Sequence, residues 1–249
     1  MIQKIDTYPT FIEPFHVDFT GRVFLGILGN HLLNAAGKHS SSRGWGIGAL
    51  NETKHTWVLS RLSIEMTEMP RQYETIEVKT WVENVMRLFT NRNFAILHPD
   101  GKAYGYARSV WAMIDLETRK PCDLLSLYDG DIQRYVVSDE ENVCPIAGHG
   151  RFKFTDAHLV RSIDTFYSDV DINGHINSIK YIEHILDVFS AEQLKHGIER
   201  FEIAYKTESY LGDRLTLFLQ IEPDGDNLVE VRREADNLII CQARVRFFK

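Results

Sequence analysis

The chain is poor in cysteine and has no long hydrophobic run, and each of these features excludes a class of protein. Its 249 residues include three scattered cysteines, Cys122, Cys144 and Cys241. They provide neither a disulfide framework nor a CxxC pair, so a reducing, cytoplasmic location is expected. The longest apolar run, from Val23 to Leu28, is far shorter than the ~20 residues that span a bilayer. No stable membrane insertion is therefore expected.

Targeting, nucleic-acid and metal-binding signals are also missing. The first residues show neither a signal-peptide core nor the Arg/Ser-rich character of a transit peptide. A net charge of −7 argues against nucleic-acid binding, although a local basic patch for an acidic partner stays compatible with it. The ten histidines form no HExxH motif or paired ligand spacing, so neither a metal nor another cofactor is expected.

What the chain does contain is an internal repeat. The strand-like segment 61–83 resembles the segment 200–222, with the same offset of 139 residues at both ends (200 − 61 and 222 − 83). A helical pattern precedes each segment, at 24–39 and 178–196. Each half therefore predicts one long helix followed by antiparallel strands, a unit that wraps a curved sheet around its helix.

The repeat also predicts the domain organisation. Residues 1–135 form the first unit, 136–150 a linker and 151–249 the second unit. Within the first helical pattern, Gly26 and Gly29 predict a close backbone approach to a neighbouring element.

Polar groups gather just before the second helix. Asp171, Asn173 and His175 alternate along the chain, so in an extended backbone they point to one side. Asn177 or Ser178 is expected to cap the helix that follows. An acid, an amide and an imidazole thus lie at a helix N-terminus, where backbone N–H groups favour negative charge. The alternative is that these residues only cap and orient the helix entrance.

The first half differs at the corresponding places. Its helix entrance, Asp18 to Phe24, contains no histidine and no matching asparagine, and the offset places Met69 opposite Glu208. The second half is polar where the first is apolar. We therefore expect one catalytic centre, drawn mainly from the second half, and an apolar pocket shaped mainly by the first.

Several short segments, spread in order over nearly the whole chain, carry a family resemblance. They are Thr56–Arg61 (TWVLSR), Glu77–Trp81 (EVKTW), Ala107–Met113 (ARSVWAM), Ser168–Asn177 (SDVDINGHIN) followed by Lys180-Tyr181, and Tyr205–Glu208 (YKTE). In this order they resemble the plant-type acyl-acyl carrier protein (acyl-ACP) thioesterases, tandem hotdog enzymes that also occur in bacteria. The resemblance implies an α+β fold, a tandem (double) hotdog in which each copy is a curved antiparallel sheet around one long helix.

The resemblance also implies the catalytic residues. The family's catalytic set maps onto Asp171, Asn173, His175 and Glu208. Many plant members have a cysteine directly after that glutamate, whereas this chain has Ser209, and no cysteine lies near a matched segment. A cysteine nucleophile is therefore not expected. Ser209 is an auxiliary candidate, either as a hydrogen-bond donor or as filler, and Asn177 is another.

The expected reaction is hydrolysis of a fatty acyl-ACP thioester to free fatty acid and carrier. Glu208 with His175 would activate water, which is worth ~10²–10⁴ in rate. Asp171 would orient His175 or share the role of base, and the sequence does not decide which carboxylate acts. Asn173 and the backbone N–H groups at the helix start would polarise the carbonyl.

Two further sets of residues are expected to contact the substrate. Candidates for the acyl-chain pocket are Phe24, Trp57, Met66 and Met69, although such residues in a hotdog copy are more often plain core. Candidates for binding an acidic carrier are Arg119, Lys120, Lys180, Lys206 and Arg214, although residues of this kind more often form a solvated face.

Other functions remain compatible with the sequence. A hotdog thioesterase acting on acyl-CoA is one, and a non-catalytic acyl-binding module is another. The motif order argues against a hotdog dehydratase. The sequence leaves a homodimer open, although two fused copies already supply the pairing that single hotdogs obtain by dimerising.

Overall fold

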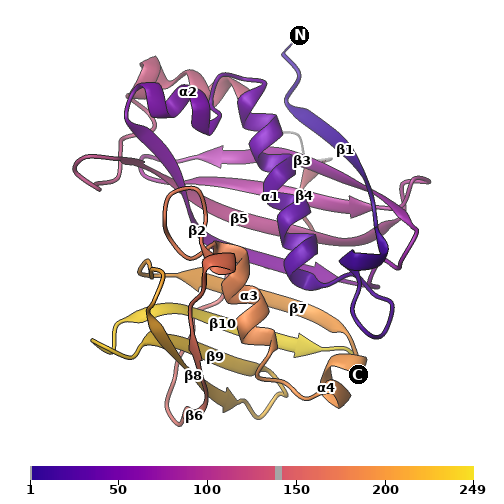
Figure 1. Cartoon of the computed structure of the whole chain (residues 1–249). Coiled ribbons are helices and arrows are strands. Elements are labelled where there is room, and N and C mark those ends of the chain that lie inside the picture. The colour runs from indigo at the N-terminus through magenta and orange to yellow at the C-terminus, as the bar shows by residue number, and fades with distance from the viewer. Residues whose placement is uncertain (1, 138–141) are drawn as a thin grey trace.

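A computed structural model describes residues 2–137 and 142–249, and its main feature is a ten-stranded antiparallel sheet (Figure 1). The strands lie in the order β1-β3-β4-β5-β2-β7-β10-β9-β8-β6. The first half comprises β1 (Ile5–Phe11), η1 (Pro14–His16), α1 (Leu25–Ser41), α2 (Ile47–Glu52), β2 (His55–Met66), β3 (Thr75–Val85), β4 (Thr90–Leu97) and β5 (Ala103–Asp115). After η2 (Leu127–Tyr135), the second half comprises β6 (His158–Asp164), η4 (Tyr167–Asp169), α3 (Ser178–Leu186), α4 (Ala191–Lys195), β7 (Ile198–Tyr205), β8 (Arg214–Ile221), β9 (Asn227–Arg233) and β10 (Ile239–Phe247).

The two halves join through the pairing of β2 with β7. Ser63 lies opposite Glu202, and on either side of this pair Arg61 faces Ala204 and Glu65 faces Arg200. Since the repeat offset makes Ser63 the counterpart of Glu202, this register is symmetric about their pairing. The halves are thus related by an approximate twofold axis through Ser63 and Glu202, which confirms the tandem hotdog.

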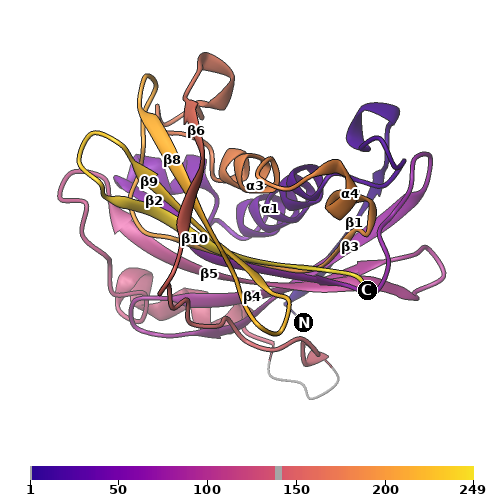
Figure 2. The ribbon, with the colours of Figure 1, turned by 90° about the horizontal axis from the view of Figure 1, so that it is seen from below.

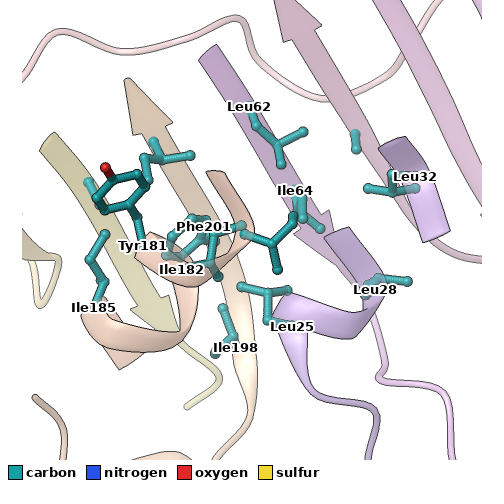
Figure 3. Close-up of a cluster of buried hydrophobic side chains, with 14 of the residues drawn as sticks. Leu25, Leu28, Leu32, Leu62, Ile64, Tyr181, Ile182, Ile185, Ile198 and Phe201 are labelled. Carbon is teal, nitrogen blue, oxygen red and sulfur yellow. The ribbon is translucent and has the colours of Figure 1, made fainter. Parts of the chain in front are cut away.

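Helices α1 and α3 lie side by side in the concave face of the curved sheet (Figure 2). Figure 3 shows the buried side chains that join them to the central strands: Leu25, Leu28 and Leu32 from α1, Tyr181, Ile182 and Ile185 from α3, Leu62 and Ile64 from β2, and Ile198 and Phe201 from β7. The predicted close approach is confirmed. A Cβ on Gly26 would lie 2.9 Å from Cγ of Glu183, and one on Gly29 would lie 2.8 Å from Cδ1 of Ile179. Larger residues here would push the helices apart.

The prediction of one long helix per half is correct for the first half and wrong for the second. The segment 178–196 is divided into α3 and α4. The division follows from a new N-terminus at Ser190, whose side chain accepts the N–H of Gln193 while the Gln193 side chain returns to the Ser190 N–H. This capping box begins a second helix in a different direction. None of the described helices is both long and apolar enough to cross a bilayer.

The predicted linker, 136–150, includes residues 138–141, which lie outside the described part of the chain. Its last residues run over the sheet face opposite the helices (Figure 2). His149 Nδ1 lies 2.7 Å from Oγ of Ser63, and the Gly150 N–H donates to Oε2 of Glu202 at 2.7 Å. The linker is therefore fixed at the approximate twofold axis.

Candidate functional site

The segment with Asp171, Asn173 and His175 forms a tight turn. The Asp171 N–H donates to the His175 carbonyl at 2.8 Å, and the Gly174 N–H donates to the Asp171 carbonyl at 3.1 Å. Gly174 has φ +81°, a left-handed conformation that suits glycine. The expectation of an extended segment is therefore wrong, since the turn reverses the chain within five residues.

The Asp171 carboxylate holds this turn together. Its Oδ1 accepts the N–H of Asn173 at 2.8 Å and the N–H of His175 at 3.2 Å. The Asn173 amide is exposed and lies 3.4 Å from Oδ2 of Asp171. Asp171 thus orients His175 through its backbone, and the described contacts include none between the carboxylate and the imidazole ring.

His175 and Glu208 come together from separate elements. Nδ1 of His175 lies 3.4 Å from Oε1 of Glu208. The backbone explains this, because His175 forms a β-bridge with Tyr210 and the Ile176 N–H donates to the Ser209 carbonyl at 2.9 Å. The ring centroids of Tyr210 and His175 lie 5.3 Å apart with the rings edge-to-face, a contact that the sequence did not predict. Both members of the pair are partly exposed, so a water molecule can reach them.

Arg119 completes this cluster from the first half. It forms an ion pair with Oε1 of Glu208, the same oxygen that faces His175. Arg119, a predicted carrier contact, thus lies beside the candidate catalytic pair and remains partly exposed. Its loop follows β5, whose far end lies beside the start of β2. A residue of the first half therefore holds the carboxylate of the second.

The N-terminus of α3 lies directly beyond His175. Asn177 is the N-cap, as predicted, and its Oδ1 accepts the N–H of Ile179 at 2.9 Å. The N–H of Lys180 donates to the Asn177 carbonyl at 2.9 Å. The N–H of Ser178 donates to no acceptor among the described residues. Of the helix-start amides, that of Ser178 is therefore best placed to serve a substrate.

Ser209 lies behind the site and is fully buried. Its Oγ lies 2.6 Å from Oη of Tyr181 in α3. Burial raises the pKa of Tyr181, so the phenol stays protonated and hydrogen-bonded. Of the two interpretations of Ser209, this geometry favours the hydrogen-bonding one.

Among the cysteines, burial raises the pKa of Cys122 and of Cys241, which disfavours a reactive thiolate at either.

The four acyl-pocket candidates do not lie together. Trp57 is near the start of β2, where its indole N–H donates to the Trp45 carbonyl at 2.9 Å, and Met66 is at the other end of that strand. A strand advances about 3.3 Å per residue, so the nine steps along β2 from Trp57 to Met66 span roughly 30 Å. Trp57 lies at the end of the sheet that holds His175. Met69 and Phe24 line a cavity at the opposite end.

Three of the five carrier-binding candidates already have acidic partners. Besides Arg119, Lys180 lies 2.7 Å from Glu183 and Arg214 lies 2.9 Å from Asp164. Lys120 and Lys206 are exposed, and no described carboxylate pairs with either. No group of three or more potential metal ligands is present among residues 2–137 and 142–249.

Family models of the acyl-ACP thioesterase N-terminal and C-terminal domains match residues 7–128 and 153–248. The chain belongs to the acyl-ACP thioesterase family. The crystal structure of an acyl-ACP thioesterase from Bacteroides thetaiotaomicron is 52% identical in sequence and has a TM-score of 0.88, with 98% of each chain covered. The 12:0-ACP thioesterase of Umbellularia californica, at 17% identity and a TM-score of 0.84, covers 99% of this chain and 98% of its own, and shows the shared fold.

Plant members of the family are more distant and longer. An oleoyl-acyl carrier protein thioesterase of Coriandrum sativum is 25% identical over 219 residues, which is 81% of this chain and 58% of the relative. A palmitoyl-acyl carrier protein thioesterase of Gossypium hirsutum is 26% identical over 193 residues, which is 72% of this chain and 46% of the relative. The chain thus spans about half the length of these plant acyl-ACP thioesterases.

Proposed function

We propose that the protein hydrolyses fatty acyl-ACP thioesters to free fatty acid and carrier. The observation that carries the proposal is the pairing of His175 with Glu208 next to the N-terminus of α3, in a chain that belongs to the acyl-ACP thioesterase family. A thioester needs an activated water and a stabilised oxyanion, and these groups supply both.

In the proposed mechanism, the His175–Glu208 pair takes a proton from water. The hydroxide adds to the thioester carbonyl, and the oxyanion accepts hydrogen bonds from the Ser178 N–H and the Asn173 amide. Collapse of the tetrahedral intermediate breaks the C–S bond, and the leaving thiolate takes the proton. Preorganised donors of this kind are each worth ~10²–10³ in turnover.

Arg119 has a supporting role in this mechanism. Its guanidinium forms an ion pair with Oε1 of Glu208 and so holds that carboxylate in place beside His175. Asp171 acts indirectly, because its carboxylate accepts backbone N–H groups of the turn that positions His175. We assign the entrance of the acyl chain to the end of the sheet that carries Trp57, since that end also carries His175.

The test is turnover of the purified protein on one acyl chain carried either by acyl carrier protein or by CoA. Release of free thiol from the carrier substrate, at a kcat/KM well above that for acyl-CoA, is the expected result. A strong preference for acyl-CoA would favour the alternative of an acyl-CoA thioesterase. Tight binding without thiol release from either substrate would favour a non-catalytic acyl-binding protein.

A further inference from the structure

A cavity of about 440 Å³ lies at the end of the sheet opposite His175, between the N-terminus of α1 and the C-terminal part of α3. Its walls are largely apolar and include Phe19, Phe24, Met69, Leu186 and Leu194. We call this end the Arg22 pole, after the cation that lines the cavity. Small-molecule pockets of this character typically measure about 300–1,000 Å³.

The Arg22 pole is the symmetry counterpart of the catalytic site. Gly21 has φ +76° where Gly174 has φ +81°, and both turns lead into a helix. Arg22 forms a β-bridge with Arg71, as His175 does with Tyr210.

The backbone turn is therefore repeated at the Arg22 pole, whereas the catalytic side chains are not. Arg22 stands where the second half has His175, and Met69 stands where it has Glu208. Without the imidazole and the carboxylate, no pair remains at this pole to activate water. This end of the sheet therefore keeps the backbone turn of the candidate site and lacks the groups that would activate water.

The charge of Arg22 has no acidic partner among the described residues. Its Nη1 donates to the Lys195 carbonyl at 2.8 Å, which leaves most of its five N–H donors available. Two of the acids that line the cavity are already engaged: Asp18 Oδ1 accepts from the backbone and hydroxyl of Thr20, and Glu183 pairs with Lys180. The third, Asp187, is exposed.

We propose that the Arg22 pole binds a long-chain fatty acid, with its carboxylate on the Arg22 guanidinium and its alkyl chain along the apolar walls. The identification of this ligand as the enzyme's own product rests on the proposed function. Each buried methylene favours binding, and a carboxylate matches the planar donors of an arginine. The chain would thus hold two acyl sites, of which one hydrolyses and one only binds.

Equilibrium binding of hexadecanoate and of its methyl ester to the full-length protein tests the role of Arg22. The wild type is expected to bind the acid at least about tenfold more tightly than the ester. Arg22→Gln should remove that preference, whereas Arg71→Gln, outside the cavity lining, should retain it. Equal affinity of the wild type for acid and ester, or an unchanged preference in Arg22→Gln, would overturn the proposal.

Photocrosslinking with a diazirine-bearing fatty acid locates the ligand. Label is expected in peptides covering 15–27 and 183–198, and Leu186→Trp, which fills the cavity, should reduce it. Label confined to the peptides around His175 and Glu208 would contradict the second site. Neither measurement involves turnover. Binding of fatty acid at the Arg22 pole can therefore be observed in a protein that releases no thiol, and it can be absent from an active thioesterase.

Discussion

Met69 and Glu208 occupy equivalent positions in the two hotdog halves and lie at opposite ends of the sheet. Each lies six residues beyond its member of the central pair, Ser63 or Glu202, in opposite directions. One is a thioether in an apolar cavity, and the other is a carboxylate beside His175. The duplicated fold therefore has an equivalent backbone turn at each end, and only the end with Glu208 carries groups that can activate water.

Removal of the Asp171 carboxylate should impair hydrolysis through the position of His175. Asp171→Ala loses the acceptor for two backbone N–H groups, whereas Asp171→Asn keeps an oxygen that can accept them more weakly. We expect turnover to fall in the order wild type, Asn, Ala. The control is Asp100→Ala, which removes a comparable turn hydrogen bond to Lys102 in the β4–β5 hairpin. Equal turnover in both Asp171 variants and the wild type would exclude this role.

Ser209→Ala should affect stability more than catalysis. The variant leaves Oη of Tyr181 without its buried partner, and an unmade buried hydrogen bond costs ~1–3 kcal/mol. Urea unfolding should show this loss, while kcat should fall less than tenfold. A loss of kcat as large as that of a Glu208 variant would instead give Ser209 a direct catalytic role.

Charge reversal at Lys206 should weaken the use of a carrier substrate. Lys206 is exposed, has no described acidic partner and lies two residues before Glu208. Lys206→Glu is expected to raise KM for acyl-ACP several-fold at low salt and to leave KM for acyl-CoA unchanged. Arg214→Glu is the comparison, because Arg214 already pairs with Asp164 and Glu234 and should contribute less. An equal effect on both substrates would argue against a carrier contact.

Stability should fall on acidification because of the half-buried linker histidine His149. Burial lowers the pKa of His149 from 6.5 to about 4. Between these values the unfolded chain binds the proton and the folded chain does not, so the free energy of unfolding decreases as pH falls from about 6.5 to about 4. His149→Gln should flatten this dependence in urea titrations, whereas substitution of the exposed His158 should not. Parallel curves for His149→Gln and the wild type would contradict the assignment.

The sequence predicted the duplication well because the repeat preserves strand patterns that the fold needs. The first residues of the two segments, 61–65 and 200–204, pair symmetrically at the axis, and the constant offset reflects that requirement. The prediction failed for the end of the second helix, where the capping box at Ser190 outweighs a continuing apolar pattern. Local hydrogen bonds decided that boundary.

At the candidate site, the sequence predicted a group of residues of which His175 and Glu208 lie close together, but it did not predict their geometry. Alternation suggested an extended segment, but Gly174 with its positive φ turns the chain back at once. The sequence did not predict the contact of Arg119 with Glu208, because it joins residues 89 positions apart, which no local pattern reveals. The four acyl-pocket candidates were grouped because their side chains are apolar, and the length of β2 separates Trp57 from the other three.

The central claim, one hydrolytic end in a duplicated fold, is tested most directly by single-turnover hydrolysis of acyl-ACP with Glu208→Gln. This change removes the carboxylate charge with little change of shape, and rate should fall ~10²–10⁴-fold with unfolding unaffected. The matched change Glu52→Gln, on the exposed surface of α2, should leave the rate unchanged. Full hydrolysis by a folded Glu208→Gln variant would contradict the account.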